Sequence, residues 1–279
     1  MNRVDFLLNL AGLLLWLEWR AVRLSSPAAM PGSISGVLRH AEVHRTRRWL
    51  YLAALLALLA IRCVFYWRVG SRLDWVPSLD LGAITLPFNS VSLGRMALYS
   101  ALSFGVVFAT FHLWLLLLSM VNQSVPDTDP WQRLVRQNLG RIESWPTALK
   151  LAAPVLIVGS LWWVAHPSLA RLGMTAPPNS SWHLAQQSAL VGLGTLLSWK
   201  YLVTGMLFLG VLNAYLYLGR WSIWTYVQTT SRHLLQPLRL LPLNVGRVDF
   251  APVLGLALAW LAFMYAEIAM SRLFARLPL

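Results

Sequence analysis

Runs of apolar residues alternate with polar and basic stretches along the whole chain. An apolar run of about 18 or more residues is typical of a membrane-spanning helix, because about 20 residues at a rise of 1.5 Å cross the roughly 30 Å hydrocarbon core. The first run is short, and the third and fifth exceed one bilayer thickness, so we expect these two to tilt. The pattern predicts six spans, at 6–17, 49–67, 91–121, 149–165, within 184–218 and at 250–270.

Composition supports this interpretation. Of the 279 residues 57% are hydrophobic and only 12% are charged, about half of the roughly 25% charged residues of soluble domains. A soluble globule of this length has too little interior for so much apolar surface, so the class of water-soluble enzyme domains is excluded. The single cysteine, Cys63, permits no internal disulfide and no cysteine-based metal cluster.

Basic residues predict the orientation. Most of the 23 Lys and Arg residues fall in the stretches 20–48, 122–150 and 219–247, and such loops remain on the cytoplasmic side of a membrane. We therefore expect a multi-pass protein of the inner (cytoplasmic) membrane with both termini outside. Because Arg residues follow the first run, that run is expected to be an uncleaved anchor and not a cleaved signal peptide. On an apolar chain a net charge of +13 indicates anionic lipid headgroups as partners, not nucleic acid.

Short sequence matches indicate an internal duplication. The tetrapeptide Ala-Pro-Val-Leu occurs at 153–156 and again at 251–254, and the same offset aligns Arg141 with Arg239. An even number of spans in each copy makes the repeats parallel. The predicted fold is an all-α, polytopic membrane helix bundle of about six transmembrane helices in two parallel repeats, with cytoplasmic amphipathic helices. Its expected parts are an anchor with a basic segment (1–48), the first repeat (49–150), the second repeat (151–247) and a final span with its tail (248–279).

The stretch before the last span predicts a basic amphipathic helix at 223–241, expected to lie flat in the inner headgroup layer. Pro237 is expected to kink this helix and Pro242 to end it, and Gly246 permits a positive φ in the turn that follows. Asp249 is expected to be the N-cap of the last span, with Pro252 in its first turn. The same pattern also suits a surface helix that simply returns into the bilayer. The apolar face holds Trp224, Val227, Ser231, Leu234, Leu235, Leu238 and Leu241, and the opposite face holds Gln228, Arg232, Gln236 and Arg239.

The residues of this stretch resemble a known family. The order Pro237-x-Arg239-x-x-Pro242, then Gly246-x-x-Asp249-Phe250-Ala251-Pro252, is similar to the signature of YggT-family membrane proteins. That family leads a Pro/Arg-rich cytoplasmic stretch through Gly-x-x-Asp-hydrophobic-Ser-Pro into a final span, and it also shows a tandem duplication. Here Ala251 stands where serine is usual, and the first copy is degenerate.

The resemblance implies a non-enzymatic integral membrane protein. YggT-like proteins have no assigned catalytic chemistry or cofactor. They are similar to factors linked to ion or osmotic homeostasis, to envelope and division organisation, and to assembly of cytochrome complexes.

Charged and imidazole side chains within the apolar runs are the other candidate site. Arg62, His112, Lys200 and Glu267 lie there, and an ionisable residue at membrane depth needs a partner or water. Arg62 and Glu267 both lie toward the outer ends of their spans, so we expect them to be able to pair. Lys200 faces the bundle if its long run is one helix, and lies near the interface if the helix breaks beside it. His112 is interpreted as a polar contact within the bundle, with ligation of a haem or chlorin as the alternative.

The remaining motifs favour no catalytic chemistry. His40 and His44 have the i,i+4 spacing of metal ligands, but the arginines around them would repel a cation, so no metal site is predicted. We find no phosphate-binding loop, nucleophile elbow or acidic pair. The leading hypothesis is a scaffold or assembly factor that contacts lipid headgroups and other membrane proteins. The alternatives are a channel or transporter (or its accessory subunit) and a structural subunit of a larger membrane complex.

Overall fold

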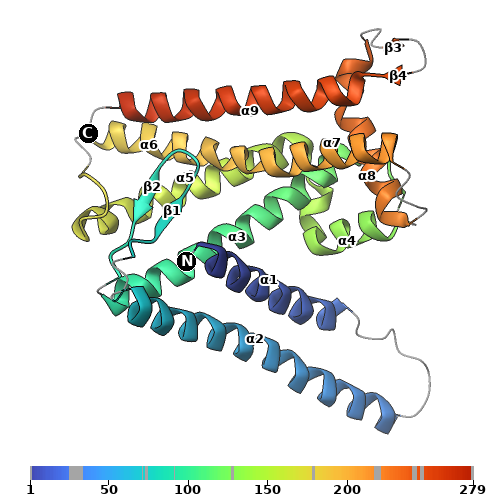
Figure 1. Ribbon diagram of the computed structural model, residues 1–279. Helices are drawn as coiled ribbons and strands as arrows, with labels where there is room; N and C mark the ends of the chain where they lie inside the picture. Colours follow the sequence, from blue (N-terminus) through green and yellow to red (C-terminus); the bar gives the residue numbers. More distant parts are fainter. Residues whose placement is uncertain are drawn as a thin grey trace. The chain divides into compact units, whose positions relative to one another are not determined.

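The computed structural model describes the chain with short gaps between its elements (Figure 1). The described residues are 2–24, 34–70, 72, 75–90, 92–126, 129–177, 180–216, 221–240, 244–245 and 248–277. The α-helices are α1 (Asn2–Leu24), α2 (Ile34–Gly70), α3 (Leu93–Val121), α4 (Pro130–Leu139), α5 (Thr147–Arg171), α6 (Ser181–Gly194), α7 (Trp199–Tyr215), α8 (Ser222–Leu234) and α9 (Ala251–Arg276). The 3-10 helices are η1 (Gly140–Ser144), η2 (Thr195–Ser198) and η3 (Gln236–Leu240).

Two short strand pairs complete the described elements. Strands β1 (Ser78–Asp80) and β2 (Thr85–Pro87) form one two-stranded sheet, and β3 (Asn244–Val245) pairs with β4 (Val248–Asp249) in another, antiparallel one. The predicted all-α class is confirmed, with these two small additions in loops between the long helices.

Five of the six predicted spans are confirmed as long apolar helices that could cross a membrane. They are Trp49–Gly70, Leu93–Val121, Thr147–Arg171, Ser181–Asn213 and Ala251–Arg276. The protein is therefore a multi-pass membrane protein by the length and hydropathy of its helices. Helix α2 begins well before its span, so the basic residues from 39 to 48 lie on a helix continuous with it.

The first predicted span does not meet the same standard. It lies within α1, where charged residues at Asp5 and Glu18 bound the uncharged stretch 6–17. As a helix that stretch would be only about 18 Å long, against a core of roughly 30 Å. The first predicted span, 6–17, therefore stays a prediction, and the packing of α1 is described below.

The chain divides into two compact units. The first is Met1–Leu79 with Pro87–Ala109, and the second is Asp80–Leu86 with Thr110–Leu279. This division falls inside α3 and does not follow the predicted repeats. The order of elements does recur, because α4, η1 and α5 are matched by α8, η3 and α9. The duplication itself stays a prediction.

In the first unit, α1 packs lengthwise along α2 and α3. A methyl group added at Gly12 would lie 2.9 Å from the Phe104 ring, so glycine is needed for this close approach. One turn further along α1, the Trp16 ring meets Phe108 edge-on at 5.0 Å. These contacts fix α1 beside two membrane spans over several turns.

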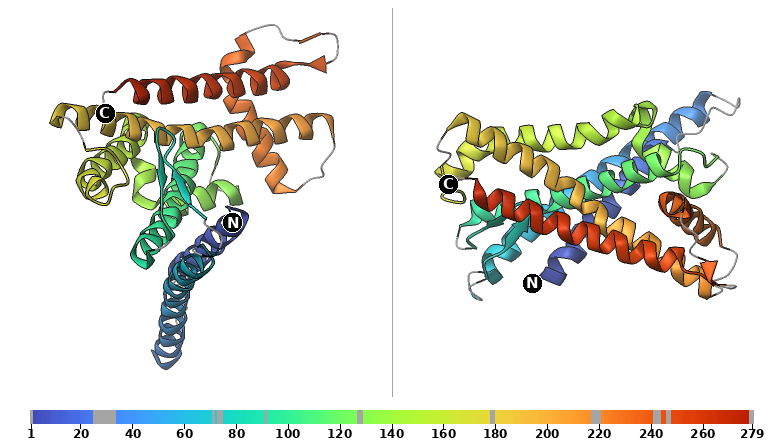
Figure 2. Two further views of the ribbon diagram at one scale, coloured as in Figure 1. Left: turned by 60° about the vertical axis from the view of Figure 1, so that its left-hand side comes forward. Right: turned by 90° about the horizontal axis from the view of Figure 1, so that it is seen from above.

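In the second unit, α5 and α6 form a closely packed helix pair. Gly159 and Gly192 lie at the contact. An added methyl group would be 2.9 Å from the Ser188 carbonyl oxygen at Gly159 and would clash with the Val155 carbonyl oxygen at Gly192. Small residues at such positions let two backbones approach and gain van der Waals contact within a bilayer. Helix α9 packs beside α7 in the same unit (Figure 2).

Candidate functional site

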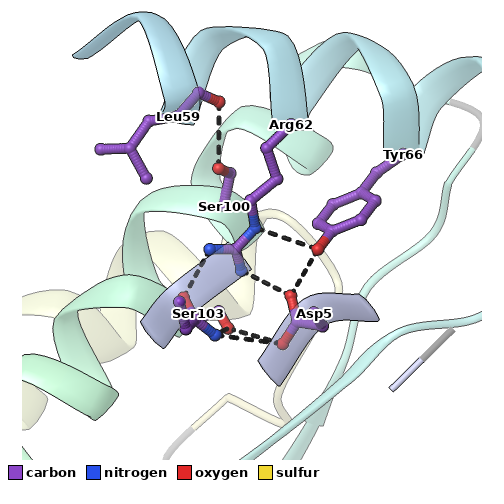
Figure 3. A network of polar contacts seen from close by, with 7 residues as sticks. Asp5, Leu59, Arg62, Tyr66, Ser100 and Ser103 are labelled. Carbon is purple, nitrogen blue, oxygen red and sulfur yellow. Dashed lines mark hydrogen bonds and ion pairs between the residues drawn. The ribbon is translucent and has the colours of Figure 1, made fainter. Parts of the chain in front are cut away.

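A buried polar network joins α1, α2 and α3 inside the first unit (Figure 3). Arg62 of α2 is 1% exposed and lies at its centre. Its guanidinium donates from Nη2 to Asp5 Oδ1 and from Nη1 to Asn9 Oδ1, each at 2.5 Å, and from Nε to the Tyr66 hydroxyl at 3.1 Å. All three guanidinium nitrogens therefore have partners.

The carboxylate of Asp5 is equally well supported. The Tyr66 hydroxyl donates to Asp5 Oδ1 at 2.7 Å, and the Ser103 hydroxyl donates to Oδ2 at 3.0 Å. Asn9 also donates to Oδ2 at 3.2 Å and to Ser103 Oγ at 2.9 Å. Because one positive and one negative charge share these bonds, the network is neutral overall. A neutral network lowers the free-energy cost of burying these charged groups beside membrane spans.

The expected pairing of Arg62 with Glu267 is wrong. Arg62 pairs with Asp5, and Glu267 pairs instead with Lys200. The sequence held a signal for the true partner, since Asp5 with Asn9 and Arg62 with Tyr66 are both i,i+4 pairs, which share a helix face. Which faces meet is a tertiary property, and Asp5, Asn9, Tyr66 and Ser103 were missed for that reason.

The second charged pair links α7 to α9. Lys200 Nζ donates to Glu267 Oε2 at 2.7 Å, and the two side chains are 21% and 39% exposed. The 3-10 helix η2 ends two residues before Lys200, but 181–213 still form one apolar span. Lys200 faces α9 within the bundle, which is the expectation for one long helix. The freed Ser198 carbonyl accepts a hydrogen bond from Trp114 Nε1 at 2.9 Å.

His112 lies partly buried in α3, with its ring edge-on to Phe111 at 5.4 Å. Within the described part of the chain, no three His, Cys, Asp or Glu side chains come together to hold a metal ion. The side chains of His40 and His44 lie outside what the structure describes.

A third cluster gathers where α3 ends and α5 begins. Lys150 is 3% exposed, and its Nζ donates to Ser119 Oγ at 2.8 Å and lies 3.6 Å from Glu143 Oε2. Ser119 donates in turn to Glu143 at 2.5 Å, and Arg136 of α4 lies 3.5 Å from the other oxygen of that carboxylate. Glu143 of η1 thus ties α3, α4 and α5 together.

Helix α8 joins this cluster through uncharged polar groups. Asn122, at the end of α3, donates to Thr230 Oγ1 at 2.7 Å, and its Oδ1 lies 2.9 Å from His233 Nδ1. The Tyr226 hydroxyl donates to Gln132 Oε1 of α4 at 3.1 Å. Burial raises the pKa of Tyr226 above its usual value.

An apolar core completes this assembly of α4, η1 and α8, which we call the α4–α8 platform. Leu115, Leu116 and Leu118 of α3 pack with Tyr226 of α8 in one cluster. Val135 and Leu139 of α4 complete that cluster. The predicted amphipathic helix is therefore confirmed in part: its apolar side is covered by protein in the region of Val227 and Ser231.

Helix α4 of the platform begins and ends with ordinary helix signals. Asp129 is the N-cap of α4, and its carboxylate accepts from the backbone N–H groups of Trp131 and Gln132. Gly140, with a φ of 59°, ends α4 in a conformation that favours glycine.

Two expectations for the family-like motif are corrected. The helix predicted at 223–241 ends at Leu234, and Pro237 lies in η3 instead of kinking a continuous helix. The last helix begins at Ala251 with Phe250 at its N-cap position, so Asp249, in β4, is one residue too early to be that cap. Pro252 is in the first turn, as predicted.

The other motif residues are placed only in part. Arg232 and Pro237 are exposed, and Arg239 lies in η3. Pro242 and Gly246 fall outside the described residues. The polar pocket beside Arg232, about 460 Å³ in volume, is lined also by His233, Gln236 and residues at the end of α3.

Comparison of the chain with protein-family models, with curated proteins and with solved structures gave no match.

Proposed function

We propose that this protein is a non-enzymatic membrane scaffold or assembly factor of the YggT type, which acts through the α4–α8 platform. The observation that carries the proposal is that two polar segments far apart in sequence fold into one platform on the ends of α3 and α5. This platform keeps a shared core and a polar cluster inside, and offers basic side chains outside. The exposed basic residues are Arg133, Arg141 and Arg232.

Anionic lipid headgroups suit this surface. The pocket beside Arg232 opens at the end of a membrane span, which is the level of lipid phosphates. A basic residue near an anionic membrane surface contributes roughly 1 kcal/mol to attraction. In the orientation that the basic loops predict, the platform lies on the cytoplasmic side of the inner membrane.

The charged residues at membrane depth favour a scaffold over a channel or transporter. Each guanidinium nitrogen of Arg62 is bonded to Asp5, Asn9 or Tyr66, and Lys200 is bonded to Glu267. These groups hold helices together, whereas a transport path would offer them to a moving ion.

The test uses the full-length protein in nanodiscs that contain both anionic and neutral lipid. A variant with Gln at the three exposed platform arginines should retain less anionic lipid and capture fewer membrane proteins after mild detergent extraction. The matched control replaces exposed basic residues outside the platform and should behave as wild type: Arg72, Arg272 and Arg276. Equal lipid retention by both variants would contradict the proposal.

The transporter alternative has its own test. Proteoliposomes of the wild-type chain should show no ion flux that Lys200→Ala abolishes. A flux that disappears with this substitution would replace the scaffold by a transport function.

A further inference from the structure

The ion pair between α7 and α9 is left partly exposed by the chain that makes it. Lys200 and Glu267 are 21% and 39% exposed, whereas Arg62, in the other pair, is 1% exposed. At 1.5 Å per residue, Glu267 lies about 24 Å from the beginning of α9 and about 14 Å from its end. That position is inside a hydrocarbon core of roughly 30 Å, where lipid chains offer no polar contact to the exposed edge of the pair.

Helix α9 itself has little covering within the chain. Only 6% of its most apolar window is buried, against 22% for the spans in α2, α3 and α5. Trp260, Glu267 and Ser271 are spaced i, i+7 and i+11, so they share one face of α9. Trp260 is 51% exposed on that face and Ser271 is exposed as well. Exposed tryptophan is among the residues enriched at protein–protein interfaces.

The symmetry that a bilayer allows favours a second copy of this chain as the partner that covers the α7–α9 face. All copies of a membrane protein are inserted in the same direction, so two copies can face each other only about a two-fold axis along the membrane normal. Lys200 and Glu267 are at one depth, because their charged atoms are 2.7 Å apart. A two-fold axis at that face reverses their left-to-right order in the facing copy, and it therefore sets each lysine opposite a glutamate. The pair is self-complementary under the symmetry that the bilayer allows.

We propose that the α7–α9 face is a homodimer interface, in which the Lys200–Glu267 pairs of two copies form a four-membered charge cluster. The second copy covers the exposed edges of both pairs and the Trp260 face of α9. This inference is independent of the α4–α8 platform and of the lipids that bind there.

The test follows association between two differently tagged full-length copies in the same membrane. Wild-type copies should co-purify after mild detergent extraction. Chains carrying Lys200→Glu should associate poorly with one another, as should chains carrying Glu267→Lys, because each four-membered cluster then holds like charges. Mixing the two variants pairs each new charge with an opposite one, so co-purification should recover several-fold. Recovery in the mixture is specific to contact between copies, because each chain alone keeps its repulsion.

Two further variants protect the test against misfolding. The double change Lys200→Met with Glu267→Leu removes both charges without leaving one unpaired, so the chain should fold yet co-purify several-fold less. The control Arg272→Glu reverses a charge on α9 away from the Trp260 face and should leave association unchanged. The proposal is overturned if wild-type copies do not co-purify, or if the mixed variants associate no better than each variant does with itself.

Discussion

Replacing Asp5 by asparagine should destabilise the first unit, because it leaves the positive charge of Arg62 buried without a counter-charge. Asparagine keeps the shape of the side chain and can still accept from Tyr66, so the substitution isolates the loss of charge. Arg62 is 1% exposed and Asp5 is 14% exposed, so solvent screens the pair weakly. Removing one partner of such a pair costs about 3–5 kcal/mol. We expect a value near the lower end, because Asn9 and Tyr66 still bond the guanidinium.

The measurement is reversible unfolding in mixed detergent micelles, followed by tryptophan fluorescence, for a double-mutant cycle. Asp5→Asn, Arg62→Met and the combined variant should give a coupling free energy of roughly 2–3 kcal/mol, the upper range for residues in one network. Asp80→Asn changes an exposed carboxylate in β1 and should alter the free energy of unfolding by no more than about 0.5 kcal/mol. A coupling free energy no larger than the change in this control would refute the argument that the ion pair holds α1 against α2.

Three other outcomes are expected. Gly192→Ala should lower the free energy of unfolding by about 1–3 kcal/mol, because it overpacks α5 against α6. Gly205→Ala has nothing within 4 Å of the added methyl group and should be neutral or stabilising. Thermal unfolding of the two variants compares these effects. Because burial raises the pKa of Tyr226, the folded state favours the neutral phenol. This contribution to stability is complete below about pH 10 and is lost as the pH rises through the folded-state pKa. Tyr226→Phe should abolish that loss when the free energy of unfolding is measured against pH. Cysteines introduced at the exposed positions Ser78 and Ser144 should react with an impermeant reagent from outside only at 78; labelling at 144 alone would invert the orientation.

The behaviour of α1 shows how tertiary contacts change the meaning of a sequence pattern. By composition its uncharged stretch is too short to cross a bilayer, since Asp5 limits it on one side. In the folded chain Asp5 is bonded to Arg62, Tyr66 and Ser103, and α1 lies beside the apolar parts of α2 and α3. One of the charges that shorten the apolar run of α1 is therefore the group that attaches the helix to its neighbours.

Some of the architecture follows from the sequence alone, because it depends on local physics. Apolar runs predicted six spans, of which five are helices that could cross a membrane, and helical periodicity predicted an amphipathic helix at α8. Proline in the first turn of α9 was predictable in the same way, because proline loses nothing at a position where the backbone N–H has no helical partner. Each of these properties depends on residues within a single continuous segment of the chain.

The pairing of charges was decided by the tertiary structure. Arg62 and Lys200 each needed an acidic partner at membrane depth. The i,i+4 spacing of polar residues marked candidate helix faces, but it did not say which faces meet. The choice depends on which helices pack together: α1 against α2 brings Asp5 to Arg62, and α7 against α9 brings Glu267 to Lys200. Helix packing also placed α4 and α8 in one platform, because their buried faces share a core that neither segment forms alone.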